Sequence, residues 1–171
     1  MQTVEKSIII NSPLEKVYET MADLKAYPQY MPNIQNVNIL GYDEAAMAAR
    51  IEVYSKSKML PKVMVSTQTL KFDIDANSIL FEQVKGEMKV FRGHRHFERI
   101  DDNSIKFNSK VEFHYNDSML AKMANSAIKM AVEANVDVLL KSVKERAEKC
   151  DLPVLSFDEI KDYLKRQLEA A

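Results

Sequence analysis

The sequence predicts an α+β domain in which an antiparallel seven-stranded sheet wraps around one long helix near the C-terminus. From Ile34 to Tyr115 apolar residues recur with a period of two, which is typical of strands that bury one face. Residues 117–149 then carry apolar residues at helical spacing, and the stretch from Leu120 to Ala147 contains neither proline nor glycine. A run of strands kept apart from the helices is typical of α+β folds, and only this helix is long enough to cover the sheet.

The first thirty residues predict one strand and two short helices. Thr3 to Ile10 alternates and then ends in an apolar run, as a strand does. Ser12-Pro13-Leu14-Glu15 is a capping-box pattern with proline at the first helical position, so a short helix should follow. Residues 23–27 predict a second short helix that stops at Pro28.

Six further strands follow. They are expected at residues 36–40, 45–54, 62–73, 78–84, 88–100 and 105–115. The first two should pair through a turn at Gly41-Tyr42-Asp43-Glu44, and the last two through a turn at residues 101–104. The last strand alternates most clearly, and one of its faces carries Ile105, Phe107, Ser109, Val111, Phe113 and Tyr115.

The long helix, which Asn116 or Asp117 should cap, has a stripe of small residues. At about 100° per residue, the stripe contains Ala124, Ala127, Ala131 and Ala134 beside Leu120 and Val138, flanked by the larger Met123, Ile128 and Leu139. Such a stripe either lets a sheet come close or leaves a void for a ligand, and periodicity alone does not choose between the two. Asn135 lies near the stripe and needs a partner if it is buried.

After Leu152-Pro153 the tail predicts one more short helix. Ser156-Phe157-Asp158-Glu159 is a second capping-box pattern, and Ile160, Leu164 and Leu168 form one narrow apolar stripe. We expect this stripe to pack on its own chain as a lid or a packing element, because three residues bury too little for a dimer interface of roughly 1,200 Å². Residues 1–150 should therefore form one domain, with residues 151–171 as its helical extension.

Composition narrows the possible partners and compartments. The net charge of −1 gives no electrostatic reason to expect DNA, RNA or an anionic membrane surface as a partner. No apolar run reaches the roughly 18 residues of a transmembrane helix, and the polar first residues do not resemble a secretory signal. The one cysteine, Cys150, excludes an internal disulfide and fits a reducing compartment, so a cytoplasmic protein is expected.

Two stretches resemble a known family. The first stretch consists of Ile10 to Tyr18 and of residues 23–32, which begin with Asp23-Leu24-Lys25-Ala26-Tyr27-Pro28. The second stretch runs from Gly86 to Phe97. They resemble the START-like superfamily, also called SRPBCC or helix-grip proteins, and within it the polyketide cyclase/dehydrase and coenzyme Q-binding branch. The resemblance covers roughly residues 3–149 and implies a helix-grip fold with a ligand-binding hydrophobic cavity between the sheet and the long helix. Where members often carry tryptophan, this sequence has Arg95, and it contains no tryptophan at all.

Arg95 is the first candidate for a binding residue. By strand alternation it shares a face with Phe91, Gly93 and Phe97, which indicates that it points inward. A buried arginine is costly unless an acid, a carbonyl or an anionic ligand group pairs with it. Two other interpretations stay open: a bulge turns the side chain outward, or an internal acid pairs with it.

The histidines give only a weak indication of a metal site. His94 and His96 share one face of the hairpin that also carries Glu112, and these residue types can bind a metal. Their spacing gives no clean three-ligand set, and Arg92 and Lys110 would repel a cation. We therefore predict a solvated sheet face with no metal and no cofactor.

The predicted function is to bind or carry a hydrophobic small molecule, such as a lipid, a quinone or a polyketide-like compound. Apolar burial would supply affinity, and Arg95 or Asn135 would orient a polar end. The expected ligand-binding residues are Arg95, Phe97, Phe113, Met123, Ala124, Ala127, Ala131 and Asn135.

The resemblance leaves two alternatives open. One is an aromatase/cyclase or dehydratase that acts on a polyketide in the same cavity, and the other is a protein-partner module resembling ribosome association toxins. The enzyme is less favoured, because only Arg95 and tyrosines could serve as acid or base and arginine is a poor proton donor. No catalytic residue is therefore expected.

Overall fold

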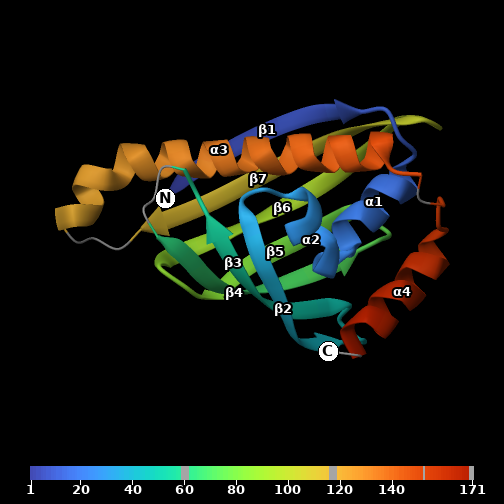
Figure 1. Cartoon of the computed structure of the whole chain (residues 1–171), viewed down its shortest axis with the longest axis horizontal. Helices are drawn as coiled ribbons and strands as arrows, with labels where there is room; N and C mark the ends of the chain where they lie inside the picture. Colours follow the sequence, from blue (N-terminus) through green and yellow to red (C-terminus); the bar gives the residue numbers. More distant parts are fainter. Residues whose placement is uncertain (59–61, 116–118, 152, 170–171) are drawn as a thin grey trace.

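A twisted antiparallel sheet and a long helix laid along it form the body of the molecule (Figure 1). The computed structural model describes residues 1–58, 62–115, 119–151 and 153–169, and of residues 119–124 it describes the backbone only. The strands are β1 (Gln2–Ile10), β2 (Ile34–Asp43), β3 (Ala48–Lys56), β4 (Val63–Asp73), β5 (Ser78–Lys85), β6 (Met88–Asp101) and β7 (Ser104–Tyr115). The helices are α1 (Leu14–Ala22), the 3₁₀ turn η1 (Leu24–Ala26), α2 (Tyr27–Tyr30), α3 (Met119–Lys149) and α4 (Phe157–Glu169).

All seven strands belong to one sheet, in the order β1-β7-β6-β5-β4-β3-β2. Every neighbouring pair is antiparallel. From β2 to β7 each strand therefore pairs with the next one in the chain, and β1 joins the far edge beside β7. This confirms the predicted α+β helix-grip fold, with two short helical segments after the first strand, α1 and the continuous η1–α2, and a tail helix after the long one.

The two short helical segments differ in detail from the prediction. No side chain caps α1, because Ser12 donates instead to the Ala147 carbonyl, 3.3 Å away, and Glu15 pairs with Arg99 at 2.6 Å. Pro28 does not stop the next helix but lies in the first turn of α2, where a missing backbone N–H breaks no helical hydrogen bond. Both differences come from contacts or geometry that a local pattern does not contain.

The turn of the first hairpin lies three residues later in the structure than the sequence predicts. β2 continues through Gly41, which pairs with Arg50 after a bulge, as far as Asp43. The turn follows at residues 44–47, where Asp43 accepts a hydrogen bond from the Ala46 N–H at 3.1 Å and Met47 adopts a φ of 48°. The glycine was therefore the mark of a strand bulge and not of the turn.

The long helix α3 turns a different face to the sheet than the alanine stripe predicts. Ala127 and Ala134 are exposed, whereas Ala131 is buried at one edge of the inner face. The inner face consists of Ile128, Val132, Val136, Leu140, Val143 and Ala147. Each additional buried methylene contributes about 0.8 kcal/mol, so the face with the larger aliphatic side chains is the one that the fold buries. The expected cap at Asn116 or Asp117 and the side chain of Leu120 lie outside the described residues.

The tail helix α4 packs beside α1 and β2, at the end of the molecule near the C-terminus (Figure 1). Its predicted capping box is present: the Ser156 N–H donates to Glu159 at 2.7 Å, and the Glu159 N–H donates to Ser156 Oγ at 3.2 Å. Its predicted stripe, Ile160, Leu164 and Leu168, is buried and belongs to the same hydrophobic cluster as the sheet. The stripe is therefore covered by this chain itself.

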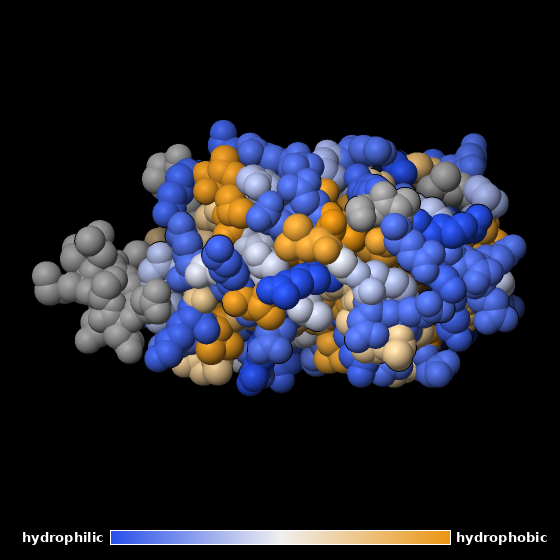
Figure 2. All heavy atoms as spheres, turned by 90° about the horizontal axis from the view of Figure 1, so that it is seen from below, coloured by the Kyte–Doolittle hydropathy of each residue, from blue (hydrophilic) through white to orange (hydrophobic). Residues whose placement is uncertain are grey.

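Some large hydrophobic side chains are exposed on the surface, among them Val63, Val65, Leu80 and Val84. On the face seen in Figure 2, apolar atoms fall into several small areas that polar atoms separate. Across the part of the chain that the structure describes, no helix combines the length and the apolar character needed to cross a membrane.

Candidate functional site

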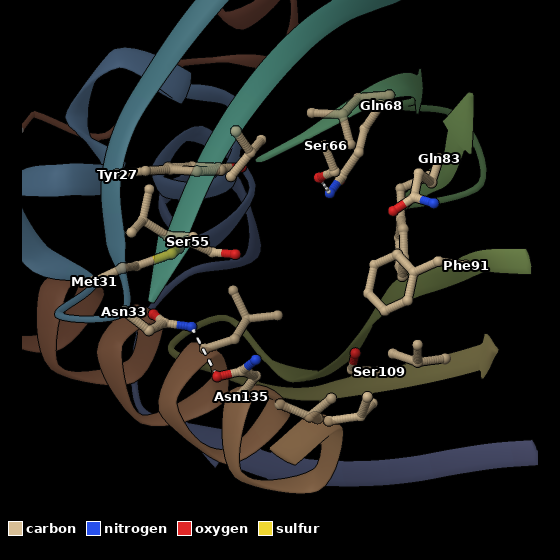
Figure 3. A pocket seen from close by; sticks show the side chains of 18 of the residues that line it. Tyr27, Met31, Asn33, Ser55, Ser66, Gln68, Gln83, Phe91, Ser109 and Asn135 are labelled. Atoms are coloured by element: carbon tan, nitrogen blue, oxygen red, sulfur yellow. Dashed lines mark hydrogen bonds between the residues drawn. The ribbon is translucent and has the colours of Figure 1, made fainter. Parts of the chain in front are cut away.

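A cavity of about 160 Å³ lies between α3 and the inner face of the sheet. Side chains from α2, from strands β2 to β7 and from α3 line it, so nearly every element of the body contributes to it. Figure 3 shows the labelled side chains projecting from these elements toward one common space.

Aromatic rings fill the neighbouring part of the same interior, toward α1. The Phe97 ring stacks on Phe107 with centroids 4.8 Å apart and meets the edge of Tyr18 at 5.5 Å. Tyr18 in turn contacts Phe157 of the tail, 6.0 Å away. Here the large rings leave no free space, so the cavity is confined to the part of the interior where the inward residues are smaller or polar.

The cavity has an apolar wall and a polar wall. Val132, Val136 and Leu139 of α3 form the apolar wall together with Val111 and Phe91. On the side formed by β3, β4 and β5, which we call the polar wall, the lining includes Ser55, Ser66, Gln68 and Gln83 beside the apolar Ile51, Val53, Leu70 and Phe81. Gln68 donates to Ser66 Oγ at 3.0 Å, and Gln83 donates to the Met88 carbonyl at 2.8 Å, so both amides are held in place but keep further hydrogen-bonding capacity.

Arg95 lies in the cavity lining, over the Phe81 ring that Gly93 also contacts. A Cβ at Gly93 would come within 2.8 Å of the Phe81 ring and 2.0 Å of the Lys110 carbonyl oxygen. Any residue other than glycine would therefore clash with the ring and with the neighbouring strand. The Arg95 guanidinium lies over the same ring, 4.6 Å from its centroid. The β6 register is regular on both sides of Arg95, which pairs with Ile79 and Ser109, so no bulge turns it outward.

The charge of Arg95 is not compensated by the protein. Among the described residues no aspartate or glutamate pairs with it, and none lines the cavity. Its Nε is buried and has no hydrogen-bond partner, and the same holds for Oγ of Ser109, the residue opposite it on β7. Burial lowers the pKa of the guanidinium, while Tyr27 and Tyr30 oppose this effect. The group remains a cation, because an arginine pKa starts far above neutrality.

The two tyrosines beside Arg95 are held neutral and engaged elsewhere. Burial raises the pKa of Tyr27 to about 12, and its hydroxyl donates to the Met21 carbonyl at 2.5 Å. Burial also raises the pKa of Tyr30, whose hydroxyl donates to the Thr20 carbonyl at 2.9 Å. Neither hydroxyl therefore serves as an acid or base near neutral pH.

The predicted binding residues fall into three groups. Arg95 and Asn135 line the cavity, and Asn135 accepts a hydrogen bond from Asn33 at 3.4 Å, which links α3 to the start of β2. Phe97, Phe113 and Ala131 are buried in the core but do not line the cavity. The inward position expected for Ala127 was wrong, because the larger side chains of α3 occupy that face. The side chains of Met123 and Ala124 lie outside the described residues.

The sequence reasoning missed the polar wall. A signal was present on β4, where Leu70 and Phe72 are buried and the same period of two leads back to Gln68 and Ser66. Polar residues at inward positions of a strand are informative, since a sheet packed on its own core would place apolar residues there.

The outer face of the sheet carries the histidines. His94 is exposed beside Lys110, and Glu112 pairs with Arg92 at 3.1 Å and approaches Lys110 at 3.9 Å. Within the described residues, no group of three or more histidine, cysteine, aspartate or glutamate side chains is arranged to hold a metal ion.

A long helix gripped by an antiparallel sheet around an internal cavity defines the START-like class of proteins. Residues 10–140 match the family described as polyketide cyclase/dehydrase and lipid transport, and the chain belongs to that family. The resemblance seen in the sequence is thereby confirmed.

Individual relatives are more distant. The ribosome association toxin RatA of Vibrio cholerae is 26% identical over 120 residues, which cover 70% of this chain and 80% of RatA. The crystal structure of the Zhui aromatase/cyclase from Streptomyces sp. R1128 matches with a TM-score of 0.80 and 17% identity, over 86% of this chain and 94% of that one. A START superfamily protein from Mycobacterium smegmatis matches with a TM-score of 0.74 and 16% identity, over 86% and 97% of the two chains. At these identities the two structures support the fold alone.

Proposed function

We propose that this protein binds and carries a hydrophobic small molecule that bears oxygen atoms. The observation that supports this most directly is the pair of unlike walls in one cavity: aliphatic side chains of α3 face serine and glutamine side chains of β3, β4 and β5. Apolar surface supplies affinity, and a few placed polar groups select orientation.

The polar wall favours an oxygenated ring compound over a plain acyl chain. An acyl chain lying along Ser55, Gln68 and Gln83 would displace water from these groups without replacing its hydrogen bonds, which lowers affinity. A quinone or a polyketide-like ring offers carbonyl or hydroxyl oxygens at its rim. A cavity of about 150 Å³ accommodates benzene in another protein, so a volume of about 160 Å³ fits about one ring of the ligand.

An enzyme of the aromatase/cyclase kind has less support. Besides Arg95, the one titratable side chain in the described lining is Tyr27, whose pKa is raised to about 12. Cyclisation and dehydration require a group that exchanges protons near neutral pH. Carriage by sequestration requires none. A protein-partner role like that of the RatA relative rests on 26% identity, with no feature of this chain that favours it.

The test fills the cavity from α3. Val136 is 5% exposed and lines the cavity, whereas Ala134 is exposed on the same helix. Val136→Phe should weaken binding of the fluorescent probe N-phenyl-1-naphthylamine about tenfold or more, roughly 1.4 kcal/mol. Ala134→Phe should leave the affinity unchanged. Thermal melts of both variants should stay near that of the parent protein.

A different result would contradict the proposal. If Val136→Phe behaves as an overpacked core, losing about 1–3 kcal/mol of stability, while the probe still binds with its original affinity, the probe does not use this cavity. Native mass spectrometry of protein purified from its own host adds a second measurement, because a carrier should retain a bound compound. That compound should be lost in Val136→Phe and kept in Ala134→Phe.

A further inference from the structure

We propose that the ligand is an anion whose carboxylate binds between Arg95 and Ser109. The inference rests on the proposed function, because it names the charge and the polar group of the molecule held in that cavity. It begins from the one charge in the described lining and from the two donors, Arg95 Nε and Ser109 Oγ, among the three buried lining atoms without a hydrogen-bond partner; the third, Asn33 Oδ1, is an acceptor.

The lining has an unbalanced charge. Arg95 is its one charged residue among the described side chains, and it lies in the interior without an acid beside it. A neutral ligand in the cavity would leave the cation both desolvated and unpaired, which is costly. An ionised carboxylate replaces the lost solvation and also cancels the charge.

The two unsatisfied atoms suit the two oxygens of one carboxylate. Nε of Arg95 carries a fixed N–H, and Ser109 Oγ carries a hydroxyl that can rotate to donate. The residues are direct cross-strand partners on β6 and β7, so their Cβ atoms are about 5 Å apart. Ser109 is only 1% exposed, and its hydroxyl points into the cavity (Figure 3). Both donors are closed to solvent in the empty protein, so the carboxylate reaches them, one donor per oxygen, after a rotation of the Arg95 or Ser109 side chain.

Neighbouring groups hold the guanidinium ready. Its Cζ lies 4.6 Å from the centroid of the Phe81 ring, and this contact restrains the guanidinium. Tyr27 and Tyr30 do not compete for the ligand, because both hydroxyls already donate to backbone carbonyls. A neutral carbonyl would use one of the two donors and leave the charge, and a phosphate dianion would bring two charges to a single cation. A monocarboxylate on a ring matches the single charge, and its two oxygens can accept from Arg95 Nε and Ser109 Oγ.

Two probes of the same shape separate the charge from the hydrophobic contact. 2-Naphthoate and 2-naphthamide share one ring system and differ in carrying a carboxylate or a neutral amide. Their affinities should be measured by isothermal titration calorimetry at pH 7 for the parent protein, for Arg95→Met and for Arg92→Met. Arg92 is the matched control, since it lies on the same strand but is exposed and pairs with Glu112 at 3.1 Å.

We expect the parent protein and Arg92→Met to bind naphthoate about 10–100-fold more tightly than naphthamide, and Arg95→Met to lose that preference while it still binds naphthamide. Equal affinities in the parent protein, unchanged by Arg95→Met, would overturn the anion and leave the proposed function intact. Failure of both probes to bind would contradict the proposed function and this inference together. If naphthoate is preferred but Arg92→Met removes the preference, the anion binds the outer face and the assignment to Arg95 is wrong.

Discussion

Two buried serines differ in one property that decides what each contributes. Ser12 is 3% exposed and donates to the Ala147 carbonyl at 3.3 Å, which joins the start of α1 to the end of α3. Ser109 is 1% exposed and its hydroxyl has no partner. A buried polar atom without a hydrogen bond costs stability, so Ser109 is a residue that the fold tolerates and the ligand is expected to use.

This difference gives a prediction for the empty protein. Ser12→Ala should lower the free energy of unfolding by about 0.5–1.5 kcal/mol, the usual contribution of one hydrogen bond. Ser109→Ala should leave it unchanged or raise it, because the substitution removes an unpaired buried hydroxyl. Urea unfolding of both variants measures the effect. A loss at Ser109 as large as that at Ser12 would mean that the hydroxyl has a partner within the protein.

The sequence predicts the positions of Arg95 and Ser109 better than it predicts their hydrogen bonds. Alternation along β6 and β7 placed Arg95 and Ser109 on inner faces, and the structure places both side chains in the cavity lining. That their polar atoms lack partners depends on which residues six other elements bring to the same space. No pattern within one strand contains that information.

At the scale of elements, α4 is held by α1 and β2 and contributes no residue to the cavity lining. Tyr163 donates to Asp23 at 2.9 Å, and Gln167 donates to the Ala22 carbonyl at 3.1 Å while accepting from the Lys25 N–H at 3.3 Å. Of the two roles expected for the tail on its own chain, lid and packing element, these contacts favour packing.

Two glutamates on α1 should respond to pH in opposite directions. Burial, with a contribution from the charge of Asp23, raises the pKa of Glu19, which lies under the segment leading to α4. Burial also acts on Glu15, but hydrogen bonds from its own backbone N–H and from Arg99 outweigh it and lower the pKa of that carboxyl. A raised folded-state pKa lowers stability as pH rises above the ordinary value near 4.5, and a lowered one adds stability above that value.

Glu19→Gln should therefore raise the melting temperature at pH 7, and this gain should shrink as the pH falls toward 4. Glu15→Gln should lower the melting temperature at pH 7, and its loss should shrink as the pH falls through the lowered pKa. Thermal melts across pH 3–8 compare the two variants. A change of the same sign for both at pH 7 would show that shape, and not ionisation, controls this helix.

At the scale of the whole molecule, strand alternation and one long uninterrupted helix were enough to predict the architecture. The orientation of α3 was not predicted correctly, because the alanine stripe was weighed without the larger Ile128, Val132 and Val136 that compete for the inner face. Periodicity alone left the cavity as one of two alternatives, and the expectation of a cavity came from the family resemblance. Whether an interior is hollow depends on how side chains from all elements add up in volume, and rings such as Phe97 and Phe107 fill one part of it while leaving the next part open.

This division of the interior predicts that stability and ligand size can be changed separately. Phe107 is fully buried in the aromatic cluster, so Phe107→Ala should cost about 3–5 kcal/mol and leave the relative affinities for small and large probes unchanged. Phe91 lines the cavity and is only partly buried, and its ring centroid lies 5.6 Å from that of Phe81. Phe91→Ala should cost less, because fewer atoms pack against this ring, and it should enlarge the cavity.

The measurement is urea unfolding together with titration of 2-naphthoate and the longer 2-anthracenecarboxylate. Phe91→Ala should shift the preference toward the three-ring acid, and Phe107→Ala should not. Since a void costs more where its surroundings are tightly packed, equal losses of stability at the two positions, with no change in size preference, would mean that the interior is one uniform core. The opposite result would establish that one part of the interior stabilises the fold while the adjoining part sets the size of the ligand.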